Sequence, residues 1–151
     1  MPDKYWDDFE KGFTFKTPSI TVTETHIVTW AGLTMDFYPL HMDKEFAART
    51  PMKERVAHGP LIFGMAVGMA GLARVEGGSI IAWMGVDNMK MLAPVKIGDT
   101  ITNHVETVEK RETSKPTQGL QTWRYTVKNQ REESVMVFDM KFLMYRKPSG
   151  A

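Results

Sequence analysis

The sequence has no cysteine among its 151 residues, which excludes disulfide bonds, thiol nucleophiles and metal sites built on thiolates. This absence fits a reducing compartment, and we expect a cytoplasmic protein. The chain also lacks an excess of one charge, since its formal net charge is +1. Such a balance gives no electrostatic reason to bind nucleic acid or an anionic membrane, so neither is expected as a partner.

Long hydrophobic runs are scarce as well. The longest uncharged segment, residues 56–73, only reaches the lower limit of a membrane span, and it contains His58, Pro60 and four glycines. A buried helix is the better interpretation of this segment. The first residues, MPDKYWDDFEKG, are acidic and aromatic, and they do not resemble a signal peptide.

The composition that remains is typical of one globular domain. Hydrophobic residues make up 42% of the chain and charged residues 25%. A chain of 151 residues is long enough to bury a hydrophobic core. We therefore expect a single domain over residues 1–151.

The first half of the chain alternates strand and helix patterns. Alternating residues predict strands over 13–16 and 20–23, and an apolar face predicts a helix over 25–33. Asp43 is a suitable N-cap for a short helix over 44–49. Residues 61–74 predict a helix that is apolar nearly all round, with Pro60 in its first turn, which indicates burial on all sides.

The second half of the chain reads as strands joined by polar turns. Apolar or alternating segments predict strands over 79–84, 86–92, 100–111, 120–128 and 135–145. Short connections between the last three favour an antiparallel meander. A sheet of this kind can bury the apolar helix by curling around it. The predicted fold class is therefore α+β, with a curved antiparallel sheet wrapped around a central helix and its outer face and edges free for a second subunit.

Three glycines of the central helix, Gly64, Gly68 and Gly71, lie close to one face of it. Each glycine costs a helix about 1 kcal/mol relative to alanine. A close approach of another element to the helix backbone is the expected compensation.

An aspartate and a histidine flank a proline in the stretch that precedes this helix, residues 36–41, DFYPLH. On a continuous helix, Asp36 and His41 would point about 140° apart. Pro39 interrupts the helix, so that a loop can turn both side chains toward one point. A carboxylate beside an imidazole can accept and return protons. The alternative is that Asp36 caps a turn and His41 is an ordinary structural histidine, and spacing alone favours this alternative.

The start of the central helix adds a second feature, His58-Gly59. Backbone N–H groups at a helix N-terminus have no partner within the helix, and glycine lets a ligand approach them closely. One such donor is worth about 3–4 kcal/mol in an oxyanion hole. The alternative is that Gly59 only starts a tight turn, while His58 packs there and orients the loop. A metal site would need His58 as a third ligand, and we expect no metal.

These residues resemble the signature of a known family. Residues 36–41, Asp43, Phe46-Ala47 and Val56-Ala57-His58-Gly59 are similar to the motif of the MaoC-like dehydratases, the (R)-specific enoyl-CoA hydratases with the hotdog fold. The later segment MLAPVKIGD, residues 91–99, resembles the strand and turn that follow the central helix in that family. The resemblance extends over about residues 9–145.

The resemblance implies a reaction and roles for the residues. Asp36 and His41 would activate the water that adds to the trans-2 double bond of an enoyl thioester. The Gly59 amide would hold the thioester carbonyl, with His58 and Tyr38 beside the substrate. No metal or other cofactor is implied, because coenzyme A enters only as part of the acyl-CoA substrate. The family forms homodimers or higher assemblies of dimers.

Two departures from the family pattern concern the substrate. Tyr38 stands where the family commonly has asparagine, and residues 64–68, GMAVG, lack a serine that the family often has. Both departures leave the length and charge of the acyl group open, as well as the choice between coenzyme A and an acyl carrier protein. The alternative functions are a hotdog acyl-CoA thioesterase and a non-catalytic subunit that binds acyl thioesters.

Overall fold

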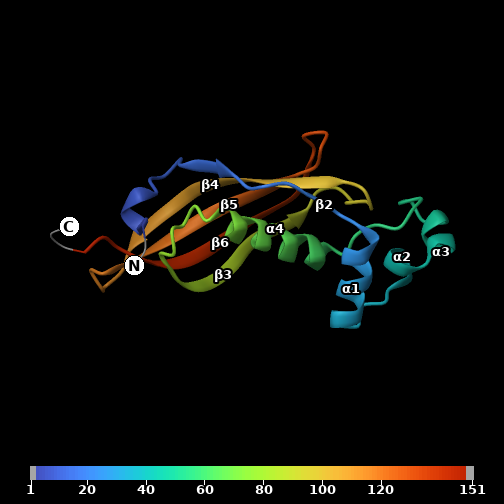
Figure 1. The fold of residues 1–151 in the computed structure, drawn as a ribbon, viewed down its shortest axis with the longest axis horizontal. Helices are drawn as coiled ribbons and strands as arrows, with labels where there is room; N and C mark the ends of the chain where they lie inside the picture. Colours follow the sequence, from blue (N-terminus) through green and yellow to red (C-terminus); the bar gives the residue numbers. More distant parts are fainter. Residues whose placement is uncertain (1–2, 149–151) are drawn as a thin grey trace.

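The computed structural model describes residues 3–148, in which six antiparallel strands form a sheet that curves along one side of a long helix (Figure 1). The path β1-β4-β5-β6-β3 gives the order of five strands, and the short β2 pairs with β4. This arrangement confirms the predicted fold class. The strands are β1 (Thr14–Lys16), β2 (Ile20–Thr21), β3 (Ile80–Met91), β4 (Thr100–Glu112), β5 (Gln118–Lys128) and β6 (Ser134–Tyr145).

The central helix α4 (Gly59–Ala73) lies against the concave face of the sheet. Its buried side chains are Leu61, Ile62, Ala66 and Met69, which pack in one core with those of β4, β5 and β6. Asn103 of β4 ties the helix to the sheet, because its Nδ2 donates to the Ala66 carbonyl at 2.7 Å.

The prediction that α4 is buried on all sides is wrong for the single chain. Gly64, Gly68, Gly71 and Leu72 are exposed along one face of the helix. The sheet covers only the opposite face, so the glycine face of α4 is left open. The composition of α4 correctly predicted an apolar helix, but composition does not determine how many other elements of the chain pack against it.

Strand β3 combines two segments that the sequence divided at Gly85. It runs without a break from Ile80 to Met91, and its register against β6 shifts at three places, one of them between Trp83 and Gly85. These irregularities interrupt the alternation of side chains, which explains why the pattern predicted two shorter strands.

Three short helices extend beyond the end of the sheet, beside the N-terminal end of α4 (Figure 1). They are α1 (Glu24–Thr34), α2 (Pro39–Met42) and α3 (Lys44–Ala48). The predicted α1 and α3 are confirmed, and Asp43 caps α3 by accepting from the Phe46 amide at 2.9 Å. Helix α2 was not predicted, because its single turn is too short to show a helical period.

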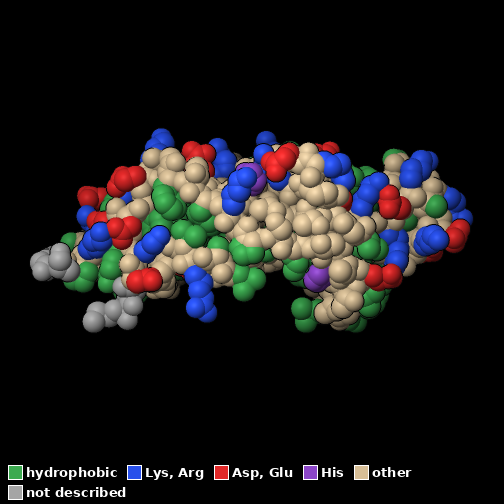
Figure 2. Space-filling view, turned by 45° about the horizontal axis from the view of Figure 1, so that its top comes forward, with side chains coloured by type: hydrophobic (Ala, Val, Ile, Leu, Met, Phe, Trp, Pro, Cys, Tyr) green, Lys and Arg blue, Asp and Glu red, His purple; other side chains and the backbone are tan. Residues whose placement is uncertain are grey.

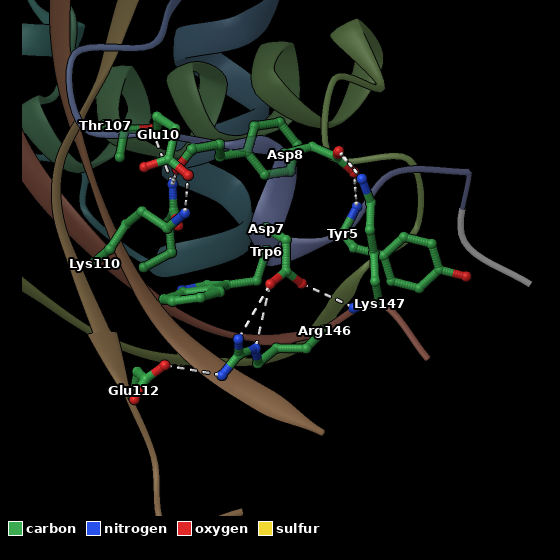
Figure 3. Close-up of polar contacts among 12 residues, drawn as sticks. Tyr5, Trp6, Asp7, Asp8, Glu10, Thr107, Lys110, Glu112, Arg146 and Lys147 are labelled. Atoms are coloured by element: carbon green, nitrogen blue, oxygen red, sulfur yellow. Dashed lines mark hydrogen bonds and ion pairs between the residues drawn. The ribbon is translucent and has the colours of Figure 1, made fainter. Parts of the chain in front are cut away.

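A cluster at the opposite end joins the N-terminal segment to the end of β6 (Figure 3). In the 3-10 helix η1 (Trp6–Asp8), the Trp6 ring lies between the cations of Lys110 and Arg146, 4.1 and 4.8 Å from its centroid. Its Nε1 donates to the Leu120 carbonyl at 2.9 Å. The N-terminal segment thus contributes Trp6 and Phe9 to the core.

The surface carries both signs of charge. In the face shown in Figure 2, Lys and Arg side chains alternate with Asp and Glu side chains, in keeping with a net charge of +1. Among residues 3–148, no helix has the length and apolar character needed to cross a membrane.

The close approach of Trp6 to Gly119 predicts a large effect of a small substitution. A Cβ atom on Gly119 would lie 2.5 Å from ring atoms of Trp6. We expect Gly119→Ala to lower the free energy of unfolding by about 1–3 kcal/mol, because the ring must shift from its cation and carbonyl contacts. Urea denaturation followed by circular dichroism measures this change.

The matched control is Gly32→Ala in α1, where a Cβ atom would meet nothing within 4 Å. This substitution should raise stability by about 0.5–1 kcal/mol, since alanine is the better helix former. Equal effects of the two substitutions would contradict the proposed role of the Trp6 contact.

Candidate active site

The Asp36 to His41 stretch is a turn followed by one helical turn. Met35 ends α1 in the left-handed conformation, with φ of 64°, and reverses the chain. Tyr38 is extended, with ψ of 131°, as expected before a proline, and Pro39 is the first residue of α2. The proline therefore separates Asp36, in the turn, from His41, on α2.

Two hydrogen bonds link this stretch to the residues that lead into α4. His41 Nδ1 lies 2.7 Å from the Val56 carbonyl oxygen, and His58 Nε2 lies 3.0 Å from the Asp36 carbonyl oxygen. The two imidazole rings stack, with centroids 3.9 Å apart and planes inclined by 31°. Asp36, His41 and His58 each contribute a polar atom to a group within 4.8 Å of one another. The structure thus brings these three predicted residues together.

The two carbonyl partners define the tautomers of the histidines. A carbonyl oxygen only accepts, so the hydrogen of neutral His41 must be on Nδ1, and that of neutral His58 on Nε2. Neutral His41 consequently has its lone pair at Nε2. An imidazole held in this way, next to a carboxylate, is suited to take a proton from a bound molecule.

Burial keeps His58 uncharged. Its side chain is fully buried, and desolvation is the main cause that lowers its pKa, with the neighbouring His41 adding to the effect. The hydrogen bond to the Asp36 carbonyl and the Asp36 carboxylate act in the opposite direction. His58 therefore adds no positive charge beside His41 near neutral pH.

Gly59 is the first residue of α4, next to the stacked imidazoles. Its N–H lies at the helix N-terminus, where it has no acceptor within the helix and faces outward at the positive end. A Cβ atom on Gly59 would lie 3.4 Å from Met91 Sδ, so the Met91 thioether covers this position. The site therefore combines a proton-accepting pair with a backbone donor and an apolar neighbour.

Tyr38 lies on the outer side of the pair. Its ring is edge-on to His41 and to Phe46, with centroids 6.1 and 6.2 Å away, and 56% of the residue is exposed. The Tyr38 amide lies 3.4 Å from Asp36 Oδ1, a long hydrogen bond within the turn. The Tyr38 ring is thus an exposed neighbour of His41.

The same three polar groups are poorly arranged for a metal ion. His41 Nδ1 and His58 Nε2 already donate to carbonyl oxygens. The remaining ring nitrogens belong to two rings that lie one over the other with planes inclined by 31°, whereas a common ion requires lone pairs that converge at about 2 Å. A metal site here would have to break the stacking and both hydrogen bonds.

Two contributors to the site were missed by the sequence. The Val56 carbonyl carries no signal, because any residue provides a carbonyl oxygen. Met91 stands in the MLAPVKIGD segment that the resemblance singled out, but nothing in its type indicated contact with Gly59. Only the path of β3 past the start of α4 brings the two together.

Curated relatives match about two thirds of the chain. Protein MaoC of Klebsiella aerogenes is 40% identical over 98 residues, which are 65% of this chain and 29% of that protein. The (R)-specific enoyl-CoA hydratase of Rhodospirillum rubrum is 35% identical over 98 residues, which are 65% of each protein. The chain therefore spans less than two thirds of the length of these relatives.

Solved structures match over nearly the whole chain. A monoamine oxidase regulatory protein from Archaeoglobus fulgius has a TM-score of 0.89 at 38% identity, over 96% of both chains. A Mycobacterium tuberculosis protein described as a double hotdog fold has a TM-score of 0.85 at 23% identity, over 98% of this chain and 46% of that one. The family model described as MaoC like domain matches residues 8–129. On this evidence the chain has the hotdog fold and belongs to the MaoC-like domain family.

Proposed function

We propose that the protein is a hydro-lyase that adds water reversibly to a trans-2-enoyl-CoA and yields a (R)-3-hydroxyacyl-CoA. The observation that carries this proposal is the fixed pair of Asp36 and His41, with the free lone pair of neutral His41 at Nε2. The name of the Rhodospirillum rubrum relative, an (R)-specific enoyl-CoA hydratase, supports the same reaction.

The pair manages one water molecule and one proton. The Asp36 carboxylate and His41 Nε2 both accept from the water, and the one that takes its proton leaves a hydroxide to form the new bond to C3. The electron pair of the double bond moves toward the thioester, and the proton is delivered to C2. In dehydration the steps run in reverse: the pair takes the proton from C2, the double bond re-forms as the C3–O bond breaks, and the 3-hydroxyl accepts a proton and leaves as water.

The thioester carbonyl is assigned to the N-terminus of α4. The Gly59 N–H is the available donor there, because the next residue, Pro60, has none. A hydrogen bond to the carbonyl oxygen draws electrons from the double bond and stabilises the enolate-like transition state. This contact and the water on the Asp36–His41 pair act on the two ends of the same conjugated system.

Substitution of either member of the pair tests the reaction. We expect Asp36→Asn and His41→Gln each to lower the hydration of crotonyl-CoA about 10²–10⁴-fold, because proton transfer to the pair is lost. The loss of enoyl-thioester absorbance measures hydration, and a thiol reagent run in parallel measures hydrolysis. His104→Gln on β4 is the matched control and should retain wild-type activity.

Three outcomes would contradict this assignment. Full hydration by either variant would remove the pair from the mechanism, and thiol release by the wild type would indicate a thioesterase. Binding of the thioester without either reaction would indicate a non-catalytic subunit.

Dialysis against EDTA should leave the wild-type rate unchanged, because both histidines are already hydrogen bonded in a way that disfavours a metal.

A cavity beneath α4 is proposed to hold the distal part of the acyl chain. Its volume is about 140 Å³, and its lining is mostly apolar: Val67, Ala70, Gly71, Glu76, Ile80, Trp123, Tyr125, Met140 and Phe142. Val67 follows Gly59 by eight residues, which is about 12 Å along the helix axis. An acyl group held at Gly59 would need a medium-length chain to reach this cavity.

Filling the cavity should change the preference for chain length. We expect Ala70→Leu to lower kcat/KM for trans-2-dodecenoyl-CoA, whose chain is long enough to reach the cavity, at least about tenfold, while kcat/KM for crotonyl-CoA stays within about twofold. Both kcat/KM values are measured with the same enzyme preparation. Their ratio therefore does not depend on the enzyme concentration or on the fraction of enzyme that is folded. Equal losses for both substrates would contradict the placement of the acyl chain in this cavity.

The β3 edge of the sheet is proposed to pair with a second copy of the chain. This edge carries exposed Trp83, Met84, Met89 and Met91, each between 45% and 57% exposed. A long apolar edge strand is a template for further pairing unless another element covers it. Pairing of two β3 strands would extend the sheet across both copies.

Charges on this edge should separate the two copies. We expect the double substitution Met84→Lys and Met89→Lys to convert a dimer into a monomer, because it opposes like charges across the pairing. Light scattering coupled to size-exclusion chromatography measures the mass. Thr14→Lys on β1, at the other edge, is the matched control and should remain a dimer; a dimer in both variants would place the contact elsewhere.

A further inference from the structure

His58 occupies the N-cap position of α4 without capping it. Its side chain makes no hydrogen bond to the first turn of the helix. The imidazole turns instead toward the loop, where Nε2 donates to the Asp36 carbonyl at 3.0 Å and the ring stacks on His41. The usual reason for a polar residue at this position is therefore absent, and a different role must account for the histidine.

The second ring nitrogen, Nδ1, also indicates that His58 has a role other than capping the helix. His58 is fully buried, and its Nδ1 has no hydrogen-bond partner among residues 3–148. An unsatisfied buried acceptor is unfavourable, so a purely structural position would favour a residue without it. The hydrogen bond of Nε2 and the stacking of the ring are both with the proposed catalytic pair.

Burial keeps His58 neutral near pH 7, and few charged groups surround it. Asp36 and His41 are the titratable groups that act on it. Helix α4 has no titratable residue, and the nearest charge on the preceding segment, Arg55, is paired with Glu24 of α1 at 2.8 Å. A neutral aromatic ring stacked on His41 favours a proton there, as the face of an aromatic ring favours a cation.

We propose that His58 is a positioning residue that acts on both members of the pair: it holds the Asp36 turn through Nε2 and supports protonated His41 through its ring. This inference rests on the proposed roles of Asp36 and His41. The His58 hydrogen bond fixes the position of the Asp36 turn. The His58 ring affects the pH range in which His41 exchanges its proton.

Two variants separate these two effects. His58→Gln keeps a donor near Nε2 and loses the ring, so the pKa of His41 should fall by about half a pH unit. His58→Phe keeps the ring and loses the donor, so the pKa of His41 should change by less than about 0.2 units while kcat falls at least about tenfold. His41 is followed by NMR titration, which is simple because the chain has four histidines.

The wild-type protein provides a test that needs no variant. Nitrogen chemical shifts should report His58 as the neutral Nε2–H tautomer at pH 7.5, because burial lowers its pKa below the ordinary value. A charged His58 at this pH, or the Nδ1–H tautomer, would overturn the inference. An unchanged His41 titration in His58→Gln would also overturn it.

The NMR readout and the activity distinguish the two proposals. If the wild type hydrates crotonyl-CoA while His41 titrates alike in all three proteins, the hydratase proposal stands and the role of His58 falls. If the titrations shift as expected but the wild type leaves enoyl thioesters unchanged, the link between His58 and His41 stands and the proposed reaction falls.

Discussion

Two hydrogen bonds to backbone carbonyls hold the candidate site together. His41 donates across to Val56, and His58 donates back to Asp36, so each of two irregular segments fixes the other. The second segment is itself anchored, because the Ala57 amide donates to the Val95 carbonyl at 2.7 Å. A turn without regular structure thereby acquires the fixed geometry that proton transfer requires.

The sheet and the central helix determine where these two hydrogen bonds form. Burial of one face of α4 against the sheet fixes where the helix begins, and its first residue, Gly59, begins beside the stacked imidazoles. The same one-sided burial leaves the opposite glycine face of α4 open and the apolar edge of β3 exposed. The position of the candidate site and the exposure of these two surfaces are therefore consequences of the same packing, in which the sheet wraps only part of the way around its helix.

The sequence predicted the periodic elements well, because side-chain period reports local structure. It failed where the outcome depends on neighbours: burial around α4 was overestimated, and β3 was divided at Gly85 because register shifts disturb the alternation. At the site, Pro39 correctly suggested that Asp36 and His41 converge. The partners of the two histidines could not be predicted, because a carbonyl oxygen is common to every residue and leaves no mark in the sequence.

The orphaned nitrogen of His58 shows how the requirements of folding and chemistry differ. A buried acceptor without a donor costs about 1–3 kcal/mol, so stability alone would favour a residue without it at this position. Glutamine could supply the donor and phenylalanine the ring, but neither combines them. Imidazole does, and the same burial that leaves Nδ1 unpaired keeps the ring neutral against a charge on His41. The unfavourable group is therefore inseparable from the two contacts that order the pair.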